Sequence, residues 1–421
     1  MNPNIDLIQM GKDAKVAARQ MAHATTEQKN RALQRIADGL KNKRKEILAA
    51  NQKDITEAET AGMSQSLLDR LSLQENRLEG IIDGVHQVIK LPNPVGEVIE
   101  SSELPNGLKV SKVRTPIGVL GIIYEARPNV TIDIAALSIK SGNCAILRGG
   151  SETLHSNKAL AEVIRQALQD SELPANAIQL IESPNRDLVL KLLHLHDYVD
   201  LIIPRGGAGL HQFCRQNSSI PVITGGIGIC HLFVDEDADF EQALEVIHNA
   251  KTQRPSVCNA LDTILVHQRI ASQFIPKVIN KLKKSGVTFR VDSQALKFSP
   301  TDSEVQLAGA QDFDTEWLSL VLGIKVVSNI HEAIEHIHEH STGHSDGILT
   351  NVPAHAEQFV NEVDSAAVYV NASTRFTDGG QLGLGSEVAI STQKLHARGP
   401  MGLRELTSYK WVIRGNYHVR R

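Results

Sequence analysis

Residues 117–150 read "IGVLGIIYEARPNVTIDIAALSIKSGNCAILRGG", and this stretch decides the fold class. Two short apolar runs, 117–124 and 144–148, flank a longer run, 129–142, in which apolar and polar residues mix. The short runs are typical of buried strands, and the run between them has the length and spacing of a helix. A strand, a helix and a strand in succession predict two parallel strands joined by a helical crossover.

The same alternation extends to both sides of this stretch. Residues 5–90 predict helices, with Thr25 and Thr26 as candidate N-caps of the second one. Further strand-like runs are 177–181, 199–203, 221–224, 231–235, 263–267, 287–292, 323–328, 347–350 and 366–371. Apolar strands alternating with amphipathic helices indicate a Rossmann-like α/β plan, with parallel strands covered by helices on both faces. That plan binds ligands beyond the carboxyl ends of its strands.

Two segments depart from this alternation. "ESSELPNGLKVSKV" (100–113) predicts a β-hairpin with Asn106-Gly107 as its turn, and "LRELTSYKWVIRGNY" (403–417) predicts a last strand. These segments are candidates to pair with each other in a sheet between subunits.

Composition excludes several classes of partner. The net charge is −4 and aromatic residues make up only 4%, so neither a basic patch nor a base-stacking surface for nucleic acid is expected. No apolar run approaches the ~20 residues that span a bilayer, and the N-terminus lacks the apolar core of a signal peptide. We therefore expect a cytoplasmic protein whose four cysteines, Cys144, Cys214, Cys230 and Cys258, are free thiols.

Cys258 lies in "KTQRPSVCNALDTILVH" (251–267), between a polar loop with a proline and a strand-like run. A thiolate attacks carbonyl carbons well, but it needs an accessible loop and nearby hydrogen-bond donors. The alternative is a buried cysteine that packs like alanine, which is the common fate of a free cysteine. The surroundings of the other three cysteines, in or beside strands and helices, fit that alternative better than those of Cys258 do.

The segment from Thr252 to His267 resembles the catalytic-cysteine segment of the aldehyde dehydrogenase superfamily, which reads Gly-Gln-x-Cys before a strand that ends in Val-His. Pro255-Ser256 replaces Gly-Gln here, a departure that resembles one branch, the gamma-glutamyl phosphate reductases. "YEARPNVTIDIAALSIKSGNCAILRGGSE" (124–152) and "HEHSTGHSDGILT" (338–350) also resemble this branch. The resemblance runs over nearly the whole chain.

The resemblance implies roles for the catalytic residues. Cys258 would be the nucleophile, and the side-chain amide of Asn129 with the backbone N–H of Cys258 would form the oxyanion hole. The alternative for Asn129 is a cap of helix 130–140. Ile223 stands where hydrolytic members carry the glutamate that activates water, so we expect acyl transfer to or from phosphate rather than hydrolysis.

The resemblance also implies a cofactor site. The superfamily has Lys-Pro-x-Glu after the strand 144–148, and its glutamate binds the adenosine ribose. Here Arg148 and Ser151 take the two charged positions, which favours a 2′-phosphate and hence NADPH/NADP+ over NAD(H). Ser151 as a simple helix cap is compatible with this.

Further cofactor contacts are implied by position. Arg205, Gly206 and Gly207 lie in a glycine turn before a helix, which suits a pyrophosphate. Glu316 aligns with the glutamate that binds the nicotinamide ribose.

An anionic substrate would need cationic contacts, and Arg254 and Arg375 are the candidates for its α-carboxylate. Arg375 lies in the glycine-rich loop 370–387, which lines the substrate pocket by resemblance. His340 and His344 are candidates for substrate or phosphate contacts. His336 and His340 have an i, i+4 spacing compatible with zinc, but the segment has no HExxH and glutamates alternate with its histidines, so no metal is expected.

Taken together, the resemblance implies NADPH-dependent reduction of L-glutamate 5-phosphate to L-glutamate 5-semialdehyde in proline biosynthesis. It implies an aldehyde dehydrogenase-like fold with an NADP-binding domain (1–98 and 113–229), a catalytic domain (230–395) and a small β oligomerisation element (99–112 and 396–421). A homo-oligomer is expected, and channelling from a glutamate 5-kinase stays open. The alternatives are a hydrolytic, NAD-dependent aldehyde dehydrogenase and a nucleotide-binding regulatory module with an inactive site.

Overall fold

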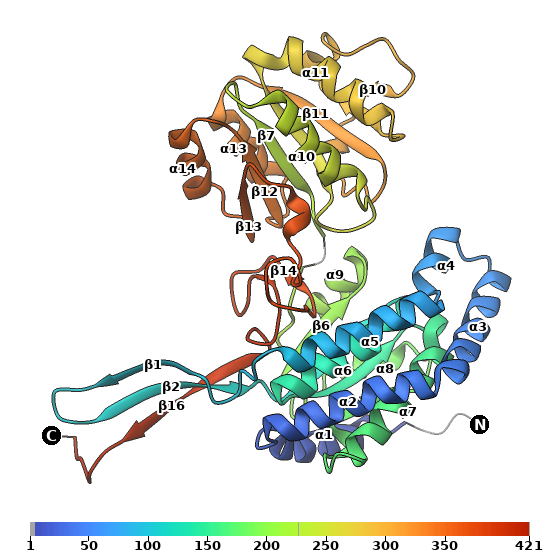
Figure 1. Ribbon diagram of the computed structural model, residues 1–421, viewed down its shortest axis with the longest axis vertical. Helices are drawn as coiled ribbons and strands as arrows, with labels where there is room; N and C mark the ends of the chain where they lie inside the picture. Colours follow the sequence, from blue (N-terminus) through green and yellow to red (C-terminus); the bar gives the residue numbers. More distant parts are fainter. Residues whose placement is uncertain (1–4, 226, 421) are drawn as a thin grey trace. The chain divides into compact units, whose positions relative to one another are not determined.

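The computed structural model describes residues 5–225 and 227–420 and divides into two compact units (Figure 1). The first unit comprises Met1–Thr224, Gly383–Ala389 and Met401–Arg421, and the second comprises Gly225–Leu382 and Ile390–Pro400. None of the helices within the described ranges has the length and apolar character that a membrane span requires.

Five helices open the first unit: α1 (Leu7–Met21), α2 (Thr26–Asn42), α3 (Arg44–Thr60), α4 (Gln65–Leu71) and α5 (Glu75–Lys90). The predicted helices are therefore confirmed. Thr25 is the N-cap of α2 and forms a capping box. Its hydroxyl accepts from the Gln28 N–H, and the Gln28 side-chain oxygen accepts from the Thr25 N–H.

The sheet of the first unit has four parallel strands in the order β5-β4-β3-β6. The strands are β3 (Val119–Tyr124), β4 (Cys144–Gly149), β5 (Ile178–Leu180) and β6 (Leu201–Arg205), and the helices that follow them are α6 (Asn129–Ser141), α7 (Leu154–Gln169), α8 (Asp187–Leu193) and α9 (Ala208–Asn217). The chain starts at β3, moves outward to β5 and then returns to the other side of β3. Helices α6 and α7 pack together, and α8 packs with α1, as a doubly wound sheet requires.

One predicted strand of this unit is wrong. The run 221–224 forms a single parallel bridge, between Val222 and Ile202 near the start of β6, and does not continue as a strand.

The second unit is a seven-stranded parallel sheet in the order β10-β9-β11-β8-β7-β12-β13. Its strands are β7 (Cys230–Val234), β8 (Leu261–His267), β9 (Thr288–Val291), β10 (Val305–Leu307), β11 (Val321–Val327), β12 (Ser345–Leu349) and β13 (Ala367–Val370). The helices are α10 (Phe240–Thr252), α11 (Gln268–Lys283), α12 (Ser293–Leu296), α13 (Ile330–His340) and α14 (Pro353–Glu362). Only β10 was not predicted among these strands.

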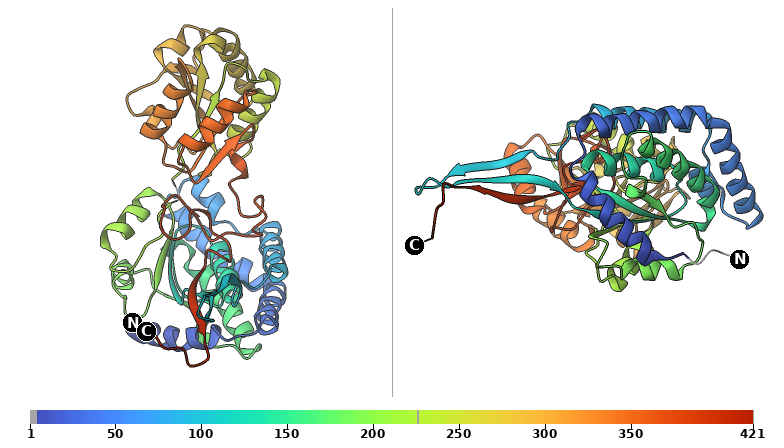
Figure 2. Two further views of the ribbon diagram at one scale, coloured as in Figure 1. Left: turned by 90° about the vertical axis from the view of Figure 1, so that its left-hand side faces the viewer. Right: turned by 90° about the horizontal axis from the view of Figure 1, so that it is seen from below.

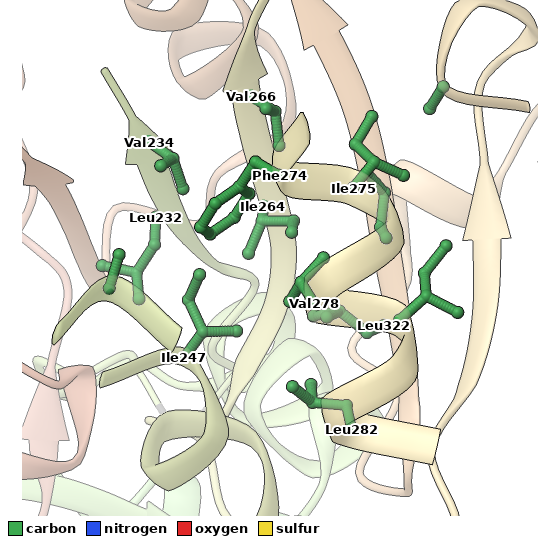
Figure 3. Close-up of a cluster of buried hydrophobic side chains, with 14 of the residues drawn as sticks. Leu232, Val234, Ile247, Ile264, Val266, Phe274, Ile275, Val278, Leu282 and Leu322 are labelled. Carbon is green, nitrogen blue, oxygen red and sulfur yellow. The ribbon is translucent and has the colours of Figure 1, made fainter. Parts of the chain in front are cut away.

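Side chains that alternate along the central strands fill two cores, one on each face of this sheet. Leu232 and Val234 of β7 point toward α10 and α11, where Phe274 and Val278 meet them (Figure 3). Phe233, between them in sequence, joins the core beneath α13 and α14 on the opposite face. Because both faces are covered, the strands read as continuous apolar runs, which is why they were visible in the sequence.

A small antiparallel sheet belongs to the first unit. It contains β1 (Val98–Glu103), β2 (Lys109–Pro116) and β16 (Thr407–Arg414) in the order β1-β2-β16, and the three strands run side by side in Figure 1 and in the right view of Figure 2. The predicted hairpin and last strand therefore form and pair. Gly107 has a φ of +84° in the hairpin turn, a left-handed conformation that glycine adopts without strain. A further two-stranded pair, β14 (Ile390–Ser391) and β15 (Gly399–Pro400), lies in the second unit.

Candidate active site

Cys258 lies in the turn between α10 and β8 and is the one partly exposed cysteine among the four, all of which are described. Burial raises the pKa of Cys144 to about 12 and that of Cys214 to about 11, and it raises the pKa of Cys230 well above that of a free thiol. Because the thiolate is the reactive form, these three thiols are inert. Only Cys258 is placed to meet a ligand.

Two neighbours hold the carbonyl group of Cys258. The thiol of Cys230, the first residue of β7, donates to the Cys258 carbonyl oxygen at 3.2 Å. The backbone of Gly228 packs so closely against the same carbonyl that a Cβ at position 228 would overlap it. The sequence Gly-Ile-Cys (228–230) is therefore part of the support for the cysteine turn.

Glu316 contacts this support from a loop ahead of β11. Its Oε1 accepts from the N–H of Gly228 at 2.9 Å. The structure thus brings the predicted ribose ligand and the predicted nucleophile to the same glycine. Cys258, Glu316 and His344 all precede their strands, so these candidates lie at the amino ends of β8, β11 and β12.

Arg375 lies beside the segment that carries Arg254 and Cys258. The Nε of Arg375 donates to Oε1 of Gln253 at 3.0 Å. Partial burial, followed by the positive charge of Arg254, lowers the pKa of the Arg375 guanidinium, while the negative charges of Cys258 and Asp378 oppose this. Two neighbouring guanidinium groups favour an anionic ligand beside the thiol.

His344 lies deeper than a ligand contact requires. Its side chain is 0% exposed, and burial lowers its pKa to about 4, so it is neutral at pH 7. Its Nδ1 shares a hydrogen bond of 2.9 Å with the Ser345 hydroxyl, which in turn contacts the Thr377 hydroxyl at 2.6 Å. The imidazole is enclosed beneath the loop that carries Thr377, and a direct contact with substrate stays a prediction.

The other histidines do not converge on a common point. The rings of His336 and His340 lie 4.2 Å apart, and His340 Nδ1 instead meets Asp314 Oδ1 at 2.7 Å. Burial lowers the pKa of His336 to about 2. Across residues 5–225 and 227–420, no group of three or more histidine, cysteine or acidic side chains is arranged to hold a metal ion.

Arg148, at the end of β4 in the first unit, is buried. Its Nη1 donates to the Gly149 carbonyl at 2.8 Å and its Nη2 to the Pro184 carbonyl at 3.1 Å, while its Nε is buried without a partner. Burial lowers the pKa of this guanidinium. Arg186 is a second positive charge near it.

Ser151 is exposed at the start of a short 3-10 helix, Ser151–Thr153. Its hydroxyl lies 3.5 Å from Oε2 of Glu152, and Oε1 of Glu152 accepts from the Ala126 N–H at 2.6 Å. Sequence reasoning gave the position of the superfamily glutamate to Ser151 and assigned no role to Glu152, the next residue. A carboxylate therefore does lie beside the serine.

The predicted phosphate turn forms at the start of α9. Gly207 is its N-cap, and a Cβ there would meet nothing within 4 Å, so the backbone can be approached. The N–H of Gly207 donates to Oε2 of Glu125 at 3.2 Å, a contact that sequence reasoning also missed. The carboxylate stands where a phosphate oxygen would bind, so this turn fits an anion.

Asn129 is the first residue of α6 and makes no capping hydrogen bond, so the alternative of a helix cap is wrong. Its Nδ2 donates to Asp133 Oδ2 at 2.8 Å, one turn further along the helix. Burial raises the pKa of Asp133 to about 6, against the opposing effects of this hydrogen bond and of Arg205. The carboxylate thereby fixes which end of the Asn129 amide is the donor. Ile223 is 2% exposed and offers no proton acceptor in its side chain.

Relatives of known name cover the whole length of the chain. The sequence matches the aldehyde dehydrogenase family over residues 4–319. The gamma-glutamyl phosphate reductase of Vibrio vulnificus (strain YJ016) is 59% identical over 413 residues, which cover 98% of this chain and 99% of that protein. The gamma-glutamyl phosphate reductase of Aeromonas salmonicida (strain A449) is 58% identical, with coverages of 99% and 100%.

Solved structures agree with these relatives. The gamma-glutamyl phosphate reductase from Thermotoga maritima has a TM-score of 0.96 at 50% identity and covers 99% of this chain and 100% of its own. An acetylating aldehyde dehydrogenase from Geobacillus thermoglucosidasius, at 18% identity, and an engineered glycolyl-CoA reductase with bound NADP+, at 16%, have TM-scores of 0.71 and 0.68. The last two share the fold alone. Their coverages are 99% and 96% of this chain and 98% and 95% of their own.

Proposed function

The chain belongs to the aldehyde dehydrogenase family, among its gamma-glutamyl phosphate reductases, and from this membership we propose that it reduces L-glutamate 5-phosphate with NADPH. The products are L-glutamate 5-semialdehyde and inorganic phosphate. The predicted α/β fold and the predicted class of oxidoreductase in proline biosynthesis, glutamate-5-semialdehyde dehydrogenase, are confirmed. The observation that carries the proposed reaction is a partly exposed cysteine beside two arginines.

Catalysis in this proposal begins with the Cys258 thiolate. It attacks the carbonyl carbon of the acyl phosphate, a carbon–sulfur bond forms, and the carbon–oxygen bond to phosphate breaks. The negative charge that develops on the carbonyl oxygen is held by Nδ2 of Asn129 and by the N–H of Cys258. NADPH, when bound, supplies the hydride that reduces the thioester. Release of the thiolate then gives the aldehyde.

The side chain at position 223 supports this direction of the reaction. An acyl phosphate is already activated, so no base is needed to prepare water as a nucleophile. Ile223 is apolar and buried, and it therefore favours exchange of the acyl group with phosphate over hydrolysis.

The guanidinium groups of Arg254 and Arg375 suit the anionic substrate. Glutamate 5-phosphate carries an α-carboxylate and a phosphate, and the fork of an arginine binds either group through two hydrogen bonds. We assign the α-carboxylate to Arg375, whose Nε bond to Gln253 fixes its orientation, and retain Arg254 as the second cation.

The family fold is that of a nicotinamide-dependent enzyme. We propose that Arg148 with Ser151 receives the 2′-phosphate of NADP(H), that the Arg205–Gly206–Gly207 turn receives the pyrophosphate, and that Glu316 receives the nicotinamide ribose. Arg148 and Arg186 supply positive charge at the proposed 2′-phosphate site, and the negative charge of Glu152 opposes it. The open space beside Gly207 supports the proposed pyrophosphate site.

The remaining parts of the proposal concern organisation. We propose that 1–98 and 113–229 form the NADP-binding domain and that 230–395 form the catalytic domain. The element of 99–112 and 396–421 would join copies of the chain in a cytoplasmic homo-oligomer. Direct transfer of the acyl phosphate from a glutamate 5-kinase is a further open part of this proposal.

The decisive experiment measures oxidation of glutamate 5-semialdehyde by NADP+ with and without inorganic phosphate. We expect turnover to depend on phosphate, because phosphate must accept the acyl group from Cys258. Fast oxidation without phosphate would instead identify a hydrolytic aldehyde dehydrogenase.

A second measurement concerns the thiol itself. One equivalent of iodoacetamide should label Cys258, substrate should protect it, and Cys258→Ala should lose at least ~10³-fold in kcat. A Cys258→Ala variant that keeps its function would favour the regulatory alternative.

A further inference from the structure

We propose that Asn259 is a positioning residue that sets the distance between the Cys258 nucleophile and Arg375. It would thereby select substrates whose anionic group lies a fixed number of bonds from the reacting carbonyl. This inference rests on the proposed function, because it takes Arg375 as the residue that binds the substrate carboxylate.

Asn259 joins the cysteine turn to the Arg375 segment through three hydrogen bonds. Its Nδ2 donates to the Thr377 carbonyl at 2.9 Å and to the Arg375 carbonyl at 3.3 Å. In return, the hydroxyl of Thr374 donates to the Asn259 carbonyl at 2.7 Å. The residue that follows the nucleophile is thus bonded to the backbone of the anion-binding residue itself.

The Arg375 segment has its own anchors on the sheet. The hydroxyl of Thr377 contacts the hydroxyls of Ser345 and Tyr369 at 2.6 Å each. Ser345 begins β12 and Tyr369 lies in β13, so these contacts fix the segment to the amino end of the sheet. The bonds from Asn259 are what then set its position relative to Cys258.

The unpaired atom of Asn259 argues against a purely structural role. The side chain is 4% exposed, and its Oδ1 is buried without a hydrogen-bond partner. A buried unsatisfied acceptor is destabilising, and a leucine of similar size would avoid it. A leucine would, however, lose the two bonds that Nδ2 donates to the Arg375 segment. The amide at position 259 is therefore explained by its connection to that segment.

The chemistry needs such a connection. In an amino-acid acyl phosphate, the carboxylate and the reacting carbonyl lie at opposite ends of a short chain. An enzyme that holds both ends gains from exact placement, and an error of about 1 Å can reduce the rate by ~10²-fold. Asn259 connects the residue that attacks the carbonyl, Cys258, to the segment of the residue proposed to bind the carboxylate, Arg375.

The test compares two aldehydes in the phosphate- and NADP+-dependent direction. Glutamate 5-semialdehyde carries the carboxylate, and butanal has the same carbon chain without the carboxylate and the amino group. In Asn259→Leu we expect kcat/KM for glutamate 5-semialdehyde to fall by at least ~30-fold and that for butanal by less than ~3-fold. The ratio of the two values should therefore fall by at least ~10-fold.

Asn351→Leu is the matched control. Asn351 is exposed, and its Nδ2 also donates to a backbone carbonyl, that of Asp237, at 2.9 Å. This bond lies beyond the carboxyl ends of the strands, so the ratio should stay at the wild-type value. The rate of Cys258 alkylation by iodoacetamide should stay within ~2-fold of wild type in both variants, since neither removes the thiol.

Arg375→Ala separates this inference from the proposed function. If Arg375→Ala leaves the ratio unchanged, the assignment of the carboxylate to Arg375 fails. If it lowers the ratio and Asn259→Leu does not, or if Asn259→Leu lowers both kcat/KM values equally, the positioning role is refuted. The double variant should lose little more than the larger single loss, because both act on one interaction.

Thr374→Val is a second route should the leucine variant not fold. It removes only the bond to the Asn259 carbonyl and keeps the shape of the side chain. We expect a smaller fall of the ratio, about 3-fold, in the same direction. A wild-type ratio in this variant would also count against the positioning role.

Discussion

At the scale of single residues, position in the fold separates chemically identical groups. Three cysteines are buried and their raised pKa values keep them as thiols, whereas Cys258 lies in a turn next to two arginines. The same holds for acids. Asp133 is held by Asn129 inside the first unit, and Glu125 instead accepts from the N–H at the start of α9. Reactivity at this scale follows from burial and from the nearest donor.

The choice of cofactor should respond to charge at two adjacent residues. In Ser151→Glu, a new carboxylate should repel a 2′-phosphate and lower the NADPH-to-NADH ratio of kcat/KM by about 10-fold, equivalent to ~1.4 kcal/mol. In Glu152→Gln, the amide oxygen can still accept from the Ala126 N–H, so loss of the charge should raise the ratio. Steady-state kinetics with both cofactors measure this. An NADPH-to-NADH ratio equal to that of wild type in both variants would refute the proposed 2′-phosphate site.

Asp133 should make stability depend on pH. Its pKa is about 6 in the folded protein against a reference value of 3.8, so the folded state binds the proton more tightly. Its contribution is therefore favourable below about pH 4 and is lost as the pH rises through 6. Asp133→Asn removes this loss. The unfolding free energy of the variant minus that of wild type should therefore increase by on the order of 1–3 kcal/mol from pH 4 to pH 7. Denaturant unfolding at both pH values measures it.

Asp170→Asn serves as the control for this comparison, because Asp170 is exposed at the end of α7. The gain of Asp133→Asn over wild type between pH 4 and pH 7 should exceed that of Asp170→Asn. Equal gains in the two variants would contradict the proposed effect of Asp133.

At the scale of elements, the second unit uses the amino ends of its parallel strands. Cys230 begins β7, Cys258 precedes β8, and His344 precedes β12. In the first unit the candidate cofactor residues instead follow β3, β4 and β6, the usual ligand edge of a doubly wound sheet. The candidate residues therefore lie at opposite strand ends in the two sheets.

Gly228 should be essential for the cysteine turn. Any Cβ there would overlap the Cys258 carbonyl oxygen, so Gly228→Ala must displace either the turn or the start of β7. We expect kcat to fall by at least ~10²-fold. Gly309→Ala is the control, because its nearest neighbour would be Asp312 at 3.8 Å, an ordinary contact. Comparable losses in the two variants would show that the overlap does not matter.

At the scale of the whole molecule, β16 presents an apolar surface at a free sheet edge. Tyr409, Trp411 and Ile413 alternate along the strand and are 49%, 54% and 62% exposed. An exposed apolar edge strand is a place where another chain pairs. This supports the proposed homo-oligomer, in which the edge strand β16 of the small sheet would contact another copy of the chain.

Trp411→Lys should therefore weaken self-association. The charge would lie on the apolar side of β16, and we expect sedimentation to shift toward the mass of a single chain. Lys410→Glu, on the other side of the same strand, should leave the mass unchanged. A Trp411→Lys variant of unaltered mass would exclude this edge as the contact between copies.

Local pattern determined most of the fold. Alternation of apolar runs with helical runs predicted both parallel sheets, because strands covered on both faces are apolar throughout. It missed β10, which has three residues and a single neighbour, and it misread 221–224, which pairs with β6 at one bridge only although Ile223 is buried. Burial and strand pairing are different properties, and sequence shows only the first.

The sequence by itself also determined the nucleophile candidate and the absence of a side-chain base at Ile223, since both are properties of single residues in a motif. Only the tertiary structure decided what these residues contact. Asn259 with Arg375, Glu316 with Gly228 and Glu125 with Gly207 are each joined across more than 80 residues of chain. His344 shows the same limit, because its burial depends on the Thr377 segment above it. Such contacts form only when packing brings distant segments together, and no local pattern records them.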